Sequence, residues 1–220
     1  MPLVVLIGSP VAHSLSPRMQ NAAFAARGLD WTYVACDVDR RDVETAVRGL
    51  EALGVAGANV TAPHKLEVAR AVEADVPSVN TLLFDPLRAV STDAAILDGL
   101  DFERPSVIGD GGAATAFRQR LPDAKVFSRR GDWPPRTDDH DLVINATPVR
   151  DDVLVRLRPG QTLVDLPYPA SATAAAARAA GARVLDGLEV LVAQGAASFE
   201  LWTGVPAPVE VMRRAVGLNS

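Results

Sequence analysis

The sequence is poor in side chains that bind metals or form cross-links: it contains one cysteine and three histidines. A single cysteine cannot build a disulfide framework or a cysteine-rich zinc site. The histidines lack the HExxH spacing of helical zinc sites, so we expect no protein-bound metal. The apolar run Leu3–Gly8 is too short to span a bilayer and lacks the basic flank and cleavage site of a secretory signal. These absences predict a cytoplasmic protein.

The sequence also lacks an excess of basic residues. Lysine and arginine together number 22, against 27 aspartates and glutamates, which gives a net charge of −5. This balance argues against a nucleic acid or a membrane surface as a partner. Lys65 and Lys125 are the only lysines. Because an ammonium group can release a proton near neutral pH and a guanidinium group cannot, a lysine within a motif is informative.

The 220 residues, 48% of them hydrophobic, suffice for one large domain or two small ones. Short apolar, β-branched runs alternate with Ala- and Arg-rich stretches, a pattern typical of βα units in an α/β fold with mainly parallel sheets. We expect strands at 3–9, 31–38, 57–61, 79–84, 89–91, 106–109, 125–128, 142–146, 162–165 and 183–185. We expect helices at 16–27, 40–53, 65–72, 93–100, 112–121, 171–179, 188–202 and 208–216.

Ten strands are many for one sheet, so we place a break near residues 93–104, where a helix would bridge two βα blocks. Ser16 is predicted to cap a helix that has Pro17 at its first position. Cys36 falls inside a predicted strand and is interpreted as a small core residue. The segment Gly131–Asp141 is interpreted as a solvated loop without a chemical role.

A glycine-rich loop follows the predicted strand at 106–109 and opens a helix, which is the context of a dinucleotide-binding fingerprint. Gly109 would permit the tight turn, and Gly111 would let the backbone approach a pyrophosphate. The amides at the helix N-terminus would then attract phosphate. Asp110 would repel a pyrophosphate unless its side chain points away. The alternative is a glycine-rich turn that binds nothing.

About 20 residues further on, the next strand ends in Ser128, Arg129 and Arg130. An acidic residue at this place would bond a ribose 2′-hydroxyl, whereas an arginine suits a 2′-phosphate. The spacing therefore favours NADP over NAD. The alternative is a pair of solvated arginines.

Polar residues cluster where strands of the first half end. Ligands of open α/β sheets bind outside the carboxyl ends of strands, so these clusters could converge on one hydroxyl-rich ligand. Lys65 and Asp93 could relay a proton to or from a substrate oxygen. An ordinary ion pair is the alternative for these two residues. The clusters are Ser14–Ser16, Asn59–Lys65, Asn80–Thr81 and Thr92–Asp93.

Taken together, these motifs resemble the shikimate dehydrogenase family nearly from end to end. The matching segments, in chain order, are Gly8–Pro17, Gly57–Lys65, Val79–Leu82, Ser91–Asp93, Asn145–Pro148, Asp165–Pro169 and Asp186–Gly195, followed by Phe199 and Trp202–Gly204. So many matches in one order are far more specific than the glycine loop alone.

The resemblance implies NADP-dependent reduction of 3-dehydroshikimate to shikimate, a step toward aromatic amino acids, without a metal. It implies a substrate-binding domain, residues 1–93 completed by 188–220, and a Rossmann-like NADP-binding domain, residues 94–187. Lys65 and Asp93 would be the catalytic pair. Shikimate or 3-dehydroshikimate would contact Ser14, Ser16, Asn59, Thr61, Asn80, Tyr168 and Gln194, the two serines holding its carboxylate. NADP would contact Gly109, Gly111, Gly112, Ala113, Ser128, Arg129 and Thr147. We expect a monomer or a homodimer.

The departures from the family pattern fall mostly in the second half. The chain is short for the family, and Gly131–Asp141 replaces a helix and a strand. Asp110 stands where the family has a small residue, and Val149-Arg150 replaces a Gly-Met continuation. Ser91 replaces an asparagine in the substrate half. Besides a working dehydrogenase, the sequence leaves two alternatives open: a catalytically weak shikimate-binding paralogue, or a quinate or aminoshikimate dehydrogenase.

Overall fold

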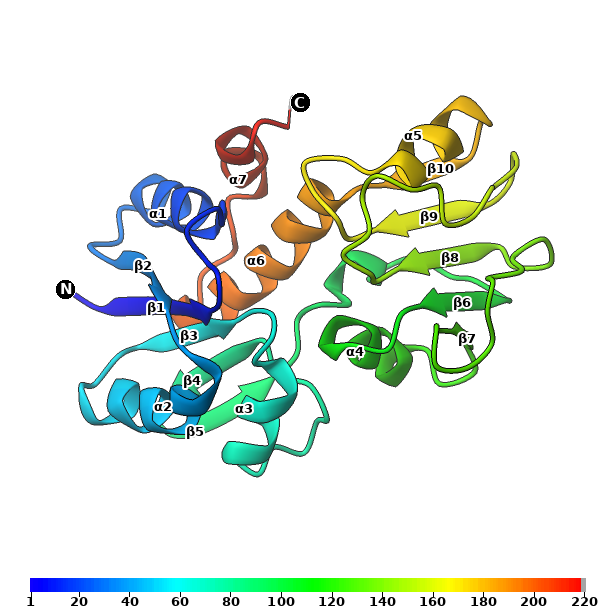
Figure 1. Ribbon diagram of the computed structural model, residues 1–220. Coiled ribbons are helices and arrows are strands. Elements are labelled where there is room, and N and C mark those ends of the chain that lie inside the picture. Colours follow the sequence, from blue (N-terminus) through cyan, green and yellow to red (C-terminus); the bar gives the residue numbers. More distant parts are fainter. Residues whose placement is uncertain (219–220) are drawn as a thin grey trace. The chain divides into compact units, whose positions relative to one another are not determined.

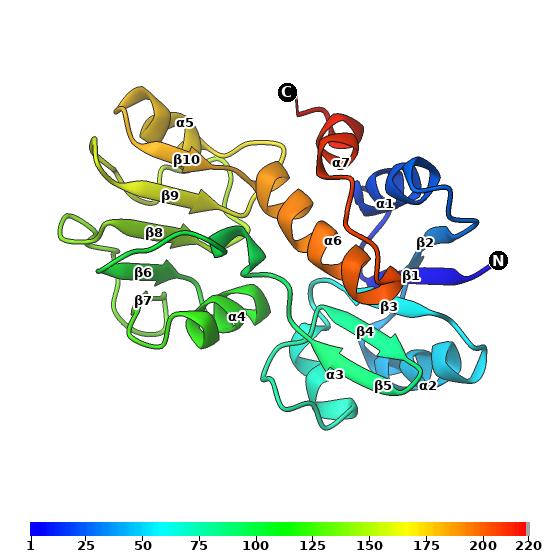
Figure 2. The same cartoon turned by 180° about the vertical axis from the view of Figure 1, so that it is seen from behind.

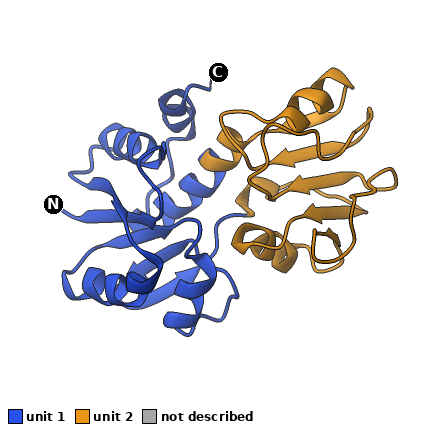
Figure 3. Cartoon of the chain, in the orientation of Figure 1, with its two compact units in different colours: residues 1–93, 192–220 blue, residues 94–191 orange. Residues whose placement is uncertain are grey.

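The computed structural model describes residues 1–218 and contains two compact units (Figures 1 and 3). Unit 1 comprises residues 1–93 together with the C-terminal segment from residue 192, and unit 2 comprises residues 94–191. The sequence places the return to the first domain at residue 188, whereas the two units divide inside a helix, between Leu191 and Val192. The start of that helix belongs to unit 2 because Val190 packs into the hydrophobic core of that unit.

Unit 1 alternates strands with helices, as the hydrophobic pattern predicts. Its strands are β1 (Leu3–Gly8), β2 (Thr32–Asp37), β3 (Gly57–Val60), β4 (Thr81–Phe84) and β5 (Leu87–Val90). Its helices are α1 (Ser16–Ala26), the 3-10 turn η1 (Arg40–Asp42), α2 (Val43–Ala52), α3 (Lys65–Ala71), the greater part of α6 (Gly187–Thr203), and α7 (Val209–Val216).

The sheet of unit 1 is mixed, with strand order β2-β1-β3-β4-β5. Strands β2, β1 and β3 are parallel, β4 runs antiparallel to β3, and β5 runs antiparallel to β4. Because β4 is antiparallel, it begins at the edge where β3 ends, with Thr81 opposite Asn59. Strand β5 then ends at the same edge. The polar residues after β1, β3 and β5, and those before β4, are thereby gathered at one edge.

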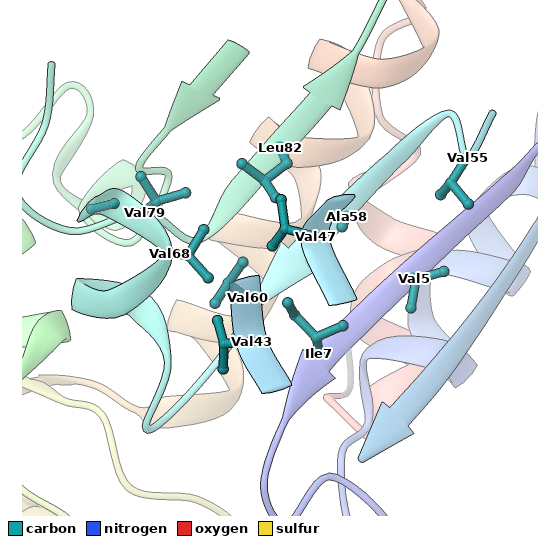
Figure 4. Packing of buried hydrophobic residues seen from close by; sticks show 11 residues of the cluster. Val5, Ile7, Val43, Val47, Val55, Ala58, Val60, Val68, Val79 and Leu82 are labelled. Carbon is teal, nitrogen blue, oxygen red and sulfur yellow. The ribbon is translucent and has the colours of Figure 1, made fainter. Parts of the chain in front are cut away.

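Helices cover both faces of this sheet. On one face, Val5 and Ile7 of β1 form a buried cluster with Val43 and Val47 of α2 (Figure 4). Elsewhere in the unit, α7 packs beside α1 (Figures 1 and 2). The first and the last parts of the chain thus build one unit, and α6 can bring its polar residues to the sheet.

Unit 2 has an all-parallel sheet with strand order β10-β9-β8-β6-β7. Its strands are β6 (Pro105–Ile108), β7 (Lys125–Phe127), β8 (Leu142–Asn145), β9 (Thr162–Asp165) and β10 (Arg183–Leu185). Its other elements are the 3-10 turn η2 (Ala95–Leu97), α4 (Gly112–Arg120) and α5 (Ala172–Ala179).

Two of the crossover connections in unit 2 contain no helix: β7–β8, residues 128–141, and β8–β9, residues 146–161. Parallel strands are usually joined through a helix that covers the sheet. Here Val155 and Leu157 from the β8–β9 connection pack with Val143 and Leu163 of the sheet and so cover part of this face. The unit therefore has a buried core although these two connections contain no helix.

Three local predictions were wrong. The helix expected at 93–100 is only the turn η2, because Asp98 is extended and Gly99 has a left-handed φ of 77°. Ser16 is the first helical residue and not the cap; its N–H donates to Ser14 Oγ at 3.2 Å. Cys36 is exposed and not a core residue, because it lies on the edge strand β2.

Candidate active site

Lys65 and Asp93 are brought together at the polar edge of the unit 1 sheet. Lys65 is the first residue of α3, and Asp93 follows β5. Lys65 Nζ lies 2.6 Å from both carboxylate oxygens of Asp93. Their side chains are only 14% and 9% exposed, so this pair differs from the screened ion pairs of protein surfaces. The Lys65 nitrogen is thereby held at one place, which is what a group that donates or accepts a proton in its two protonation states requires.

Asn80 connects this pair to the sheet. Its Nδ2 donates to Asp93 Oδ1 and to Thr92 Oγ1, each at 2.9 Å, and its Oδ1 accepts from the Thr92 N–H at 2.8 Å. The same Nδ2 lies 3.4 Å from Gln194 Oε1 on α6. Asn80 therefore joins two other predicted site residues, Asp93 and Gln194, from distant parts of the sequence.

A buried network of hydroxyl and amide groups lies beside Asn80. Asn59 Nδ2 donates to Ser198 Oγ and to Thr81 Oγ1, each at 3.1 Å, and Asn59 Oδ1 accepts from Tyr33 Oη at 2.8 Å. Ser198 Oγ also lies 2.9 Å from Thr81 Oγ1. The sequence reasoning missed Ser198 and Tyr33. Ser198 could have been found from its place four residues after Gln194, on the same face of a helix.

Ser14, Ser16 and Thr61 follow β1 and β3 at the same edge. The close approach of the two strand ends depends on Gly8, since a Cβ there would lie 2.3 Å from Thr61 Cγ2. Ser16 is buried, and Ser14 and Thr61 are half-buried. Ser14 accepts the Ser16 N–H, so the two serines form one compact turn at the start of α1.

Helix α6 is fixed against α1 next to Gln194. Gln20 Nε2 of α1 donates to the Gly195 carbonyl at 2.9 Å. A Cβ at Gly195 would lie 2.2 Å from Met19 Cε, so glycine permits this approach. Gln194 is thereby held within the same unit as the serines and Lys65.

Unit 2 contains a cavity of about 320 Å³ at the carboxyl ends of its strands. This location is where ligands bind in open α/β sheets. Of the predicted cofactor residues, Gly109, Ser128, Arg129 and Thr147 line it. The full lining is Gly109, Asp110, Ser128, Arg129, Arg130, Trp133, Thr147, Pro148, Val149 and Leu154.

The glycine loop leads from β6 into α4 beside this cavity. Gly109 has a left-handed φ of 129°, and a Cβ there would lie 3.0 Å from the Ala146 carbonyl oxygen. Gly111 is the N-cap of α4, and Gly112 and Ala113 form its first turn. The first amides of a helix have no partner within the helix and attract an anion. A Cβ at Gly111 would meet open space, so a ligand could approach the backbone there.

Charged side chains surround the mouth of the cavity. Arg129 and Arg130 are both exposed at the end of β7. Asp110, which the sequence marks as a source of repulsion, lies with its Oδ2 3.6 Å from Arg130 Nη1. The carboxylate is thus paired with a guanidinium group, which offsets part of the repulsion that a pyrophosphate would meet.

Thr147 is positioned by a buried chain of hydrogen bonds. Asp165 Oδ1 accepts from Asn145 Nδ2 at 2.8 Å, and this bond orients the Asn145 carboxamide. Asn145 Oδ1 then accepts from Thr147 Oγ1 at 2.8 Å and from the Thr147 N–H at 3.2 Å. Burial raises the pKa of Asp165 above its ordinary value, although hydrogen bonds from Ser171 and Asn145 act in the opposite direction.

The segment 131–141 is a loop, as the sequence predicts, and its Trp133 lines the cavity. A tight turn after β7 returns the chain and places Trp133 beside Arg129. Tyr168, a predicted substrate contact, lies in unit 2 between β9 and α5 and is half-buried.

Among residues 1–218, no group of three or more histidine, cysteine, aspartate or glutamate side chains could hold a metal ion. In the same part of the chain, no helix has the length and apolar character needed to cross a membrane.

Comparison with known proteins relates both ends of the chain to one family. Residues 6–82 match the model of the shikimate dehydrogenase substrate binding domain, and residues 187–216 match that of the shikimate 5′-dehydrogenase C-terminal domain. The NADP(+) shikimate dehydrogenase of Moorella thermoacetica is 38% identical over 282 aligned positions, covering 99% of this chain and 95% of the relative. That of Methanocella arvoryzae is 35% identical, with 98% of each chain covered.

The alignment with the Moorella enzyme spans 282 positions, whereas this chain has 220 residues, so the relative contains segments that are absent here.

Solved structures of shikimate dehydrogenases have the same fold as this chain. The Thermus thermophilus shikimate 5-dehydrogenase, in complex with NADP(H) and shikimate, has a TM-score of 0.82 at 28% identity and 98% coverage of each chain. The Aquifex aeolicus shikimate dehydrogenase has a TM-score of 0.85 at 26% identity, covering 99% of this chain and 98% of its own. The chain belongs to the shikimate dehydrogenase family.

Proposed function

We propose that this chain catalyses the reversible, NADP-dependent interconversion of shikimate and 3-dehydroshikimate, with Lys65 and Asp93 as the catalytic pair. One observation carries the proposal: Lys65 Nζ lies 2.6 Å from both carboxylate oxygens of Asp93, and both side chains are largely buried. The pair lies at the edge of the sheet where β1, β3 and β5 end and β4 begins. As a member of its family, the enzyme is an oxidoreductase that acts on a CH–OH group.

The proton of the reacting hydroxyl is assigned to Lys65. Oxidation of shikimate removes a hydride from the carbinol carbon and a proton from its oxygen. In the oxidation direction Lys65 acts as the neutral amine and takes that proton to become an ammonium group; in the reverse direction the ammonium group gives the proton to the developing alkoxide. Asp93 holds the nitrogen in place through both carboxylate oxygens, and Asn80 holds Asp93.

The remaining polar residues of unit 1 are assigned to substrate binding. Ser14 and Ser16 lie at the start of α1, where hydroxyl and backbone donors suit a carboxylate. Asn59, Thr61, Asn80 and Gln194 are assigned to the ring hydroxyls, and Tyr168 of unit 2 is assigned a place close to the substrate. The amide hydrogens of Asn59 already point to protein acceptors, so its part is chiefly to shape the wall of the site.

The lining of the unit 2 cavity suits the phosphorylated adenosine end of NADP in its charge. A volume of about 320 Å³ falls in the usual range of ligand pockets. The α4 N-terminus suits the pyrophosphate, and Arg129 suits the 2′-phosphate. Gly109, Gly111, Gly112, Ala113, Ser128, Arg129 and Thr147 would hold NADP, which supplies or accepts the hydride when bound. NAD is the less favoured cofactor, since no acidic residue stands at the ribose position.

The test is the initial rate of cofactor reduction with saturating shikimate, run in parallel with NADP and NAD, and repeated with quinate and aminoshikimate. We expect the fastest rate with shikimate and NADP. A faster rate with quinate or aminoshikimate would reassign the substrate, and a preference for NAD would overturn the assignment of Arg129.

Absence of any rate, combined with measurable shikimate binding by calorimetry, would instead identify a binding paralogue. The cytoplasmic location and the monomeric or dimeric state stay predictions from the sequence.

A further inference from the structure

The β7–β8 connection, residues 128–141, contains no helix but begins with a well-defined turn. The Ser128 N–H donates to the Asp132 carbonyl at 3.1 Å, and the Gly131 N–H donates to the Ser128 carbonyl at 3.0 Å. The Asp132 carboxylate also pairs with Lys125 of β7. This turn fixes the residue that follows it, Trp133, next to the end of β7.

The second half of the β7–β8 connection is hydrogen-bonded to side chains of the β8–β9 connection. The Gln161 carboxamide donates to the Thr137 carbonyl at 2.7 Å and to the His140 carbonyl at 2.6 Å. Arg158 Nη2 donates to the Asp138 carbonyl at 2.7 Å. Thr137 is buried. One flank of Trp133 is therefore attached to β7 and the other to the β8–β9 connection, and neither attachment involves a helix.

Trp133 is nevertheless 40% exposed, and it lines the cavity beside Ser128 and Arg129. The guanidinium carbon of Arg129 lies 5.7 Å from the centre of the indole ring, within the range of a cation–π contact. Val149 and Leu154 also line the cavity. The site thus offers an aromatic face and apolar side chains next to a cation.

We propose that Trp133 is the stacking surface for the adenine ring of NADP. This inference rests on the proposed function. The purine is flat and uncharged, so a cation alone holds it weakly, whereas an aromatic face stacks on any base. The 2′-phosphate belongs to the ribose attached to that purine, so adjacent Trp133 and Arg129 can bind the adenine and the phosphate together. The helix-free β7–β8 connection therefore supplies part of the cofactor site.

The test uses the full chain and isothermal calorimetry with 2′,5′-ADP and with 5′-AMP. Trp133→Ala is expected to weaken both ligands by roughly 5- to 100-fold, because each carries the adenine. Trp133→Phe, which keeps an aromatic ring, is expected to retain most of the affinity.

Fluorescence supplies a second readout that does not depend on turnover. Adenine binding is expected to quench the emission of Trp133, and the quenching should disappear in Trp133→Phe. Trp31→Phe, in unit 1, is the matched control and should keep the quenching.

Wild-type affinity for 2′,5′-ADP in Trp133→Ala, or equal losses in the Ala and Phe variants, would overturn the stacking role. With wild-type turnover intact, either result leaves the proposed function standing. Failure of the wild-type chain both to bind 2′,5′-ADP and to oxidise shikimate would overturn both proposals.

Discussion

The two units use polar side chains in opposite ways. In unit 1 the groups around Lys65 and Asp93 are buried or half-buried, and Asn59 and Asn80 bond them to one another. In unit 2 the charged residues of the cavity, Arg129 among them, are exposed. A separate buried chain of hydrogen bonds from Asp165 through Asn145 holds Thr147 of the same cavity.

This difference matches the chemistry assigned to each unit. A proton transfer needs its groups held within a few tenths of an ångström, and buried hydrogen bonds provide that precision. Binding a phosphate and a base tolerates more variation, because exposed cations and stacked rings can adjust. The unit 1 site therefore depends more on the exact placement of its groups than the unit 2 cavity does.

The largest expected effect tests the precision of unit 1. Lys65→Ala should lower kcat by about 10²- to 10⁴-fold while leaving KM for shikimate nearly unchanged, because proton transfer is needed chiefly in the transition state. Arg48→Ala, which removes a cation from an exposed pair with Glu44 on α2, is the control in steady-state kinetics. A raised KM with kcat preserved would make Lys65 a binding residue.

The buried layer of unit 2 can be tested with Asp165→Ala. The substitution leaves Asn145 and Ser171 without an acceptor, so unfolding free energy should fall by about 1–3 kcal/mol for each buried group. Because burial raises the pKa of Asp165, the native state binds more protons than the unfolded chain between the two pKa values. The stabilisation that Asp165 contributes to the wild-type protein therefore decreases as pH rises from the ordinary aspartate pKa to the raised one.

Chemical denaturation of both proteins over a series of pH values measures this effect. The cost of Asp165→Ala should be greatest below the ordinary aspartate pKa and smaller above the raised one. Asp151→Ala, at an exposed position, is the control. A cost that grows with pH would contradict the assignment.

The exposed cations of unit 2 are tested with Arg129→Ala. Loss of a charge-assisted contact should weaken NADP by about 10- to 100-fold and leave NAD unchanged. Arg136→Ala removes an exposed arginine of the same connection that does not line the cavity. The affinities of the wild-type protein and both variants are measured by titration with NADP and with NAD. Equal losses of affinity for NADP and NAD in Arg129→Ala would rule out the 2′-phosphate contact.

Ser198→Ala sharpens the description of the unit 1 network. It removes a hydroxyl that bonds Asn59, so unfolding free energy should fall by about 1–2 kcal/mol and kcat/KM should fall modestly. Thr203→Ala, on the same helix, removes a hydroxyl that donates to the Phe199 carbonyl. If both variants lose kcat/KM equally, Ser198 acts on helix stability and not on positioning.

The smallest effect concerns Asp141 at the start of β8. Burial raises the pKa of this carboxyl, but the N–H groups of Glu103 and Arg104 outweigh that effect and lower it below its usual value. The resulting stability is present above the ordinary aspartate pKa and is lost as pH falls through the lowered one. Asp141→Asn should therefore cost about 0.5–1.5 kcal/mol at neutral pH and nothing in strong acid, by the same denaturation series.

Much of the fold could be read from the sequence because the signals are local. Apolar runs such as Leu142–Asn145 and Thr162–Asp165 are short, buried and bounded by polar residues, so their strand character follows from a few neighbours. The helix expected at 93–100 was wrong because Gly99 takes a left-handed φ at its end, which composition alone did not reveal.

The site residues also divide into those that local sequence signals reveal and those that only the folded chain reveals. Lys65 and Asp93 stood out as a lysine and a carboxylate that follow predicted strands. Ser198 carried only its helical spacing from Gln194, and Trp133 carried no local signal. Ser198 reaches Asn59 only because α6 packs on the sheet, and Trp133 reaches the cavity only because the turn at 128–132 reverses the chain.

By itself, then, the sequence determined the order of βα units, the family motifs and the residue types available for proton transfer. These depend on short-range hydrophobic periodicity and on chemical identity. The tertiary structure decided that Asn80 and Asp93 meet at one edge, since that requires β4 and β5 to run antiparallel. It also decided that an aromatic side chain from a helix-free connection lies beside Arg129. Both contacts join segments whose proximity depends on hydrogen bonds and packing between strands and turns.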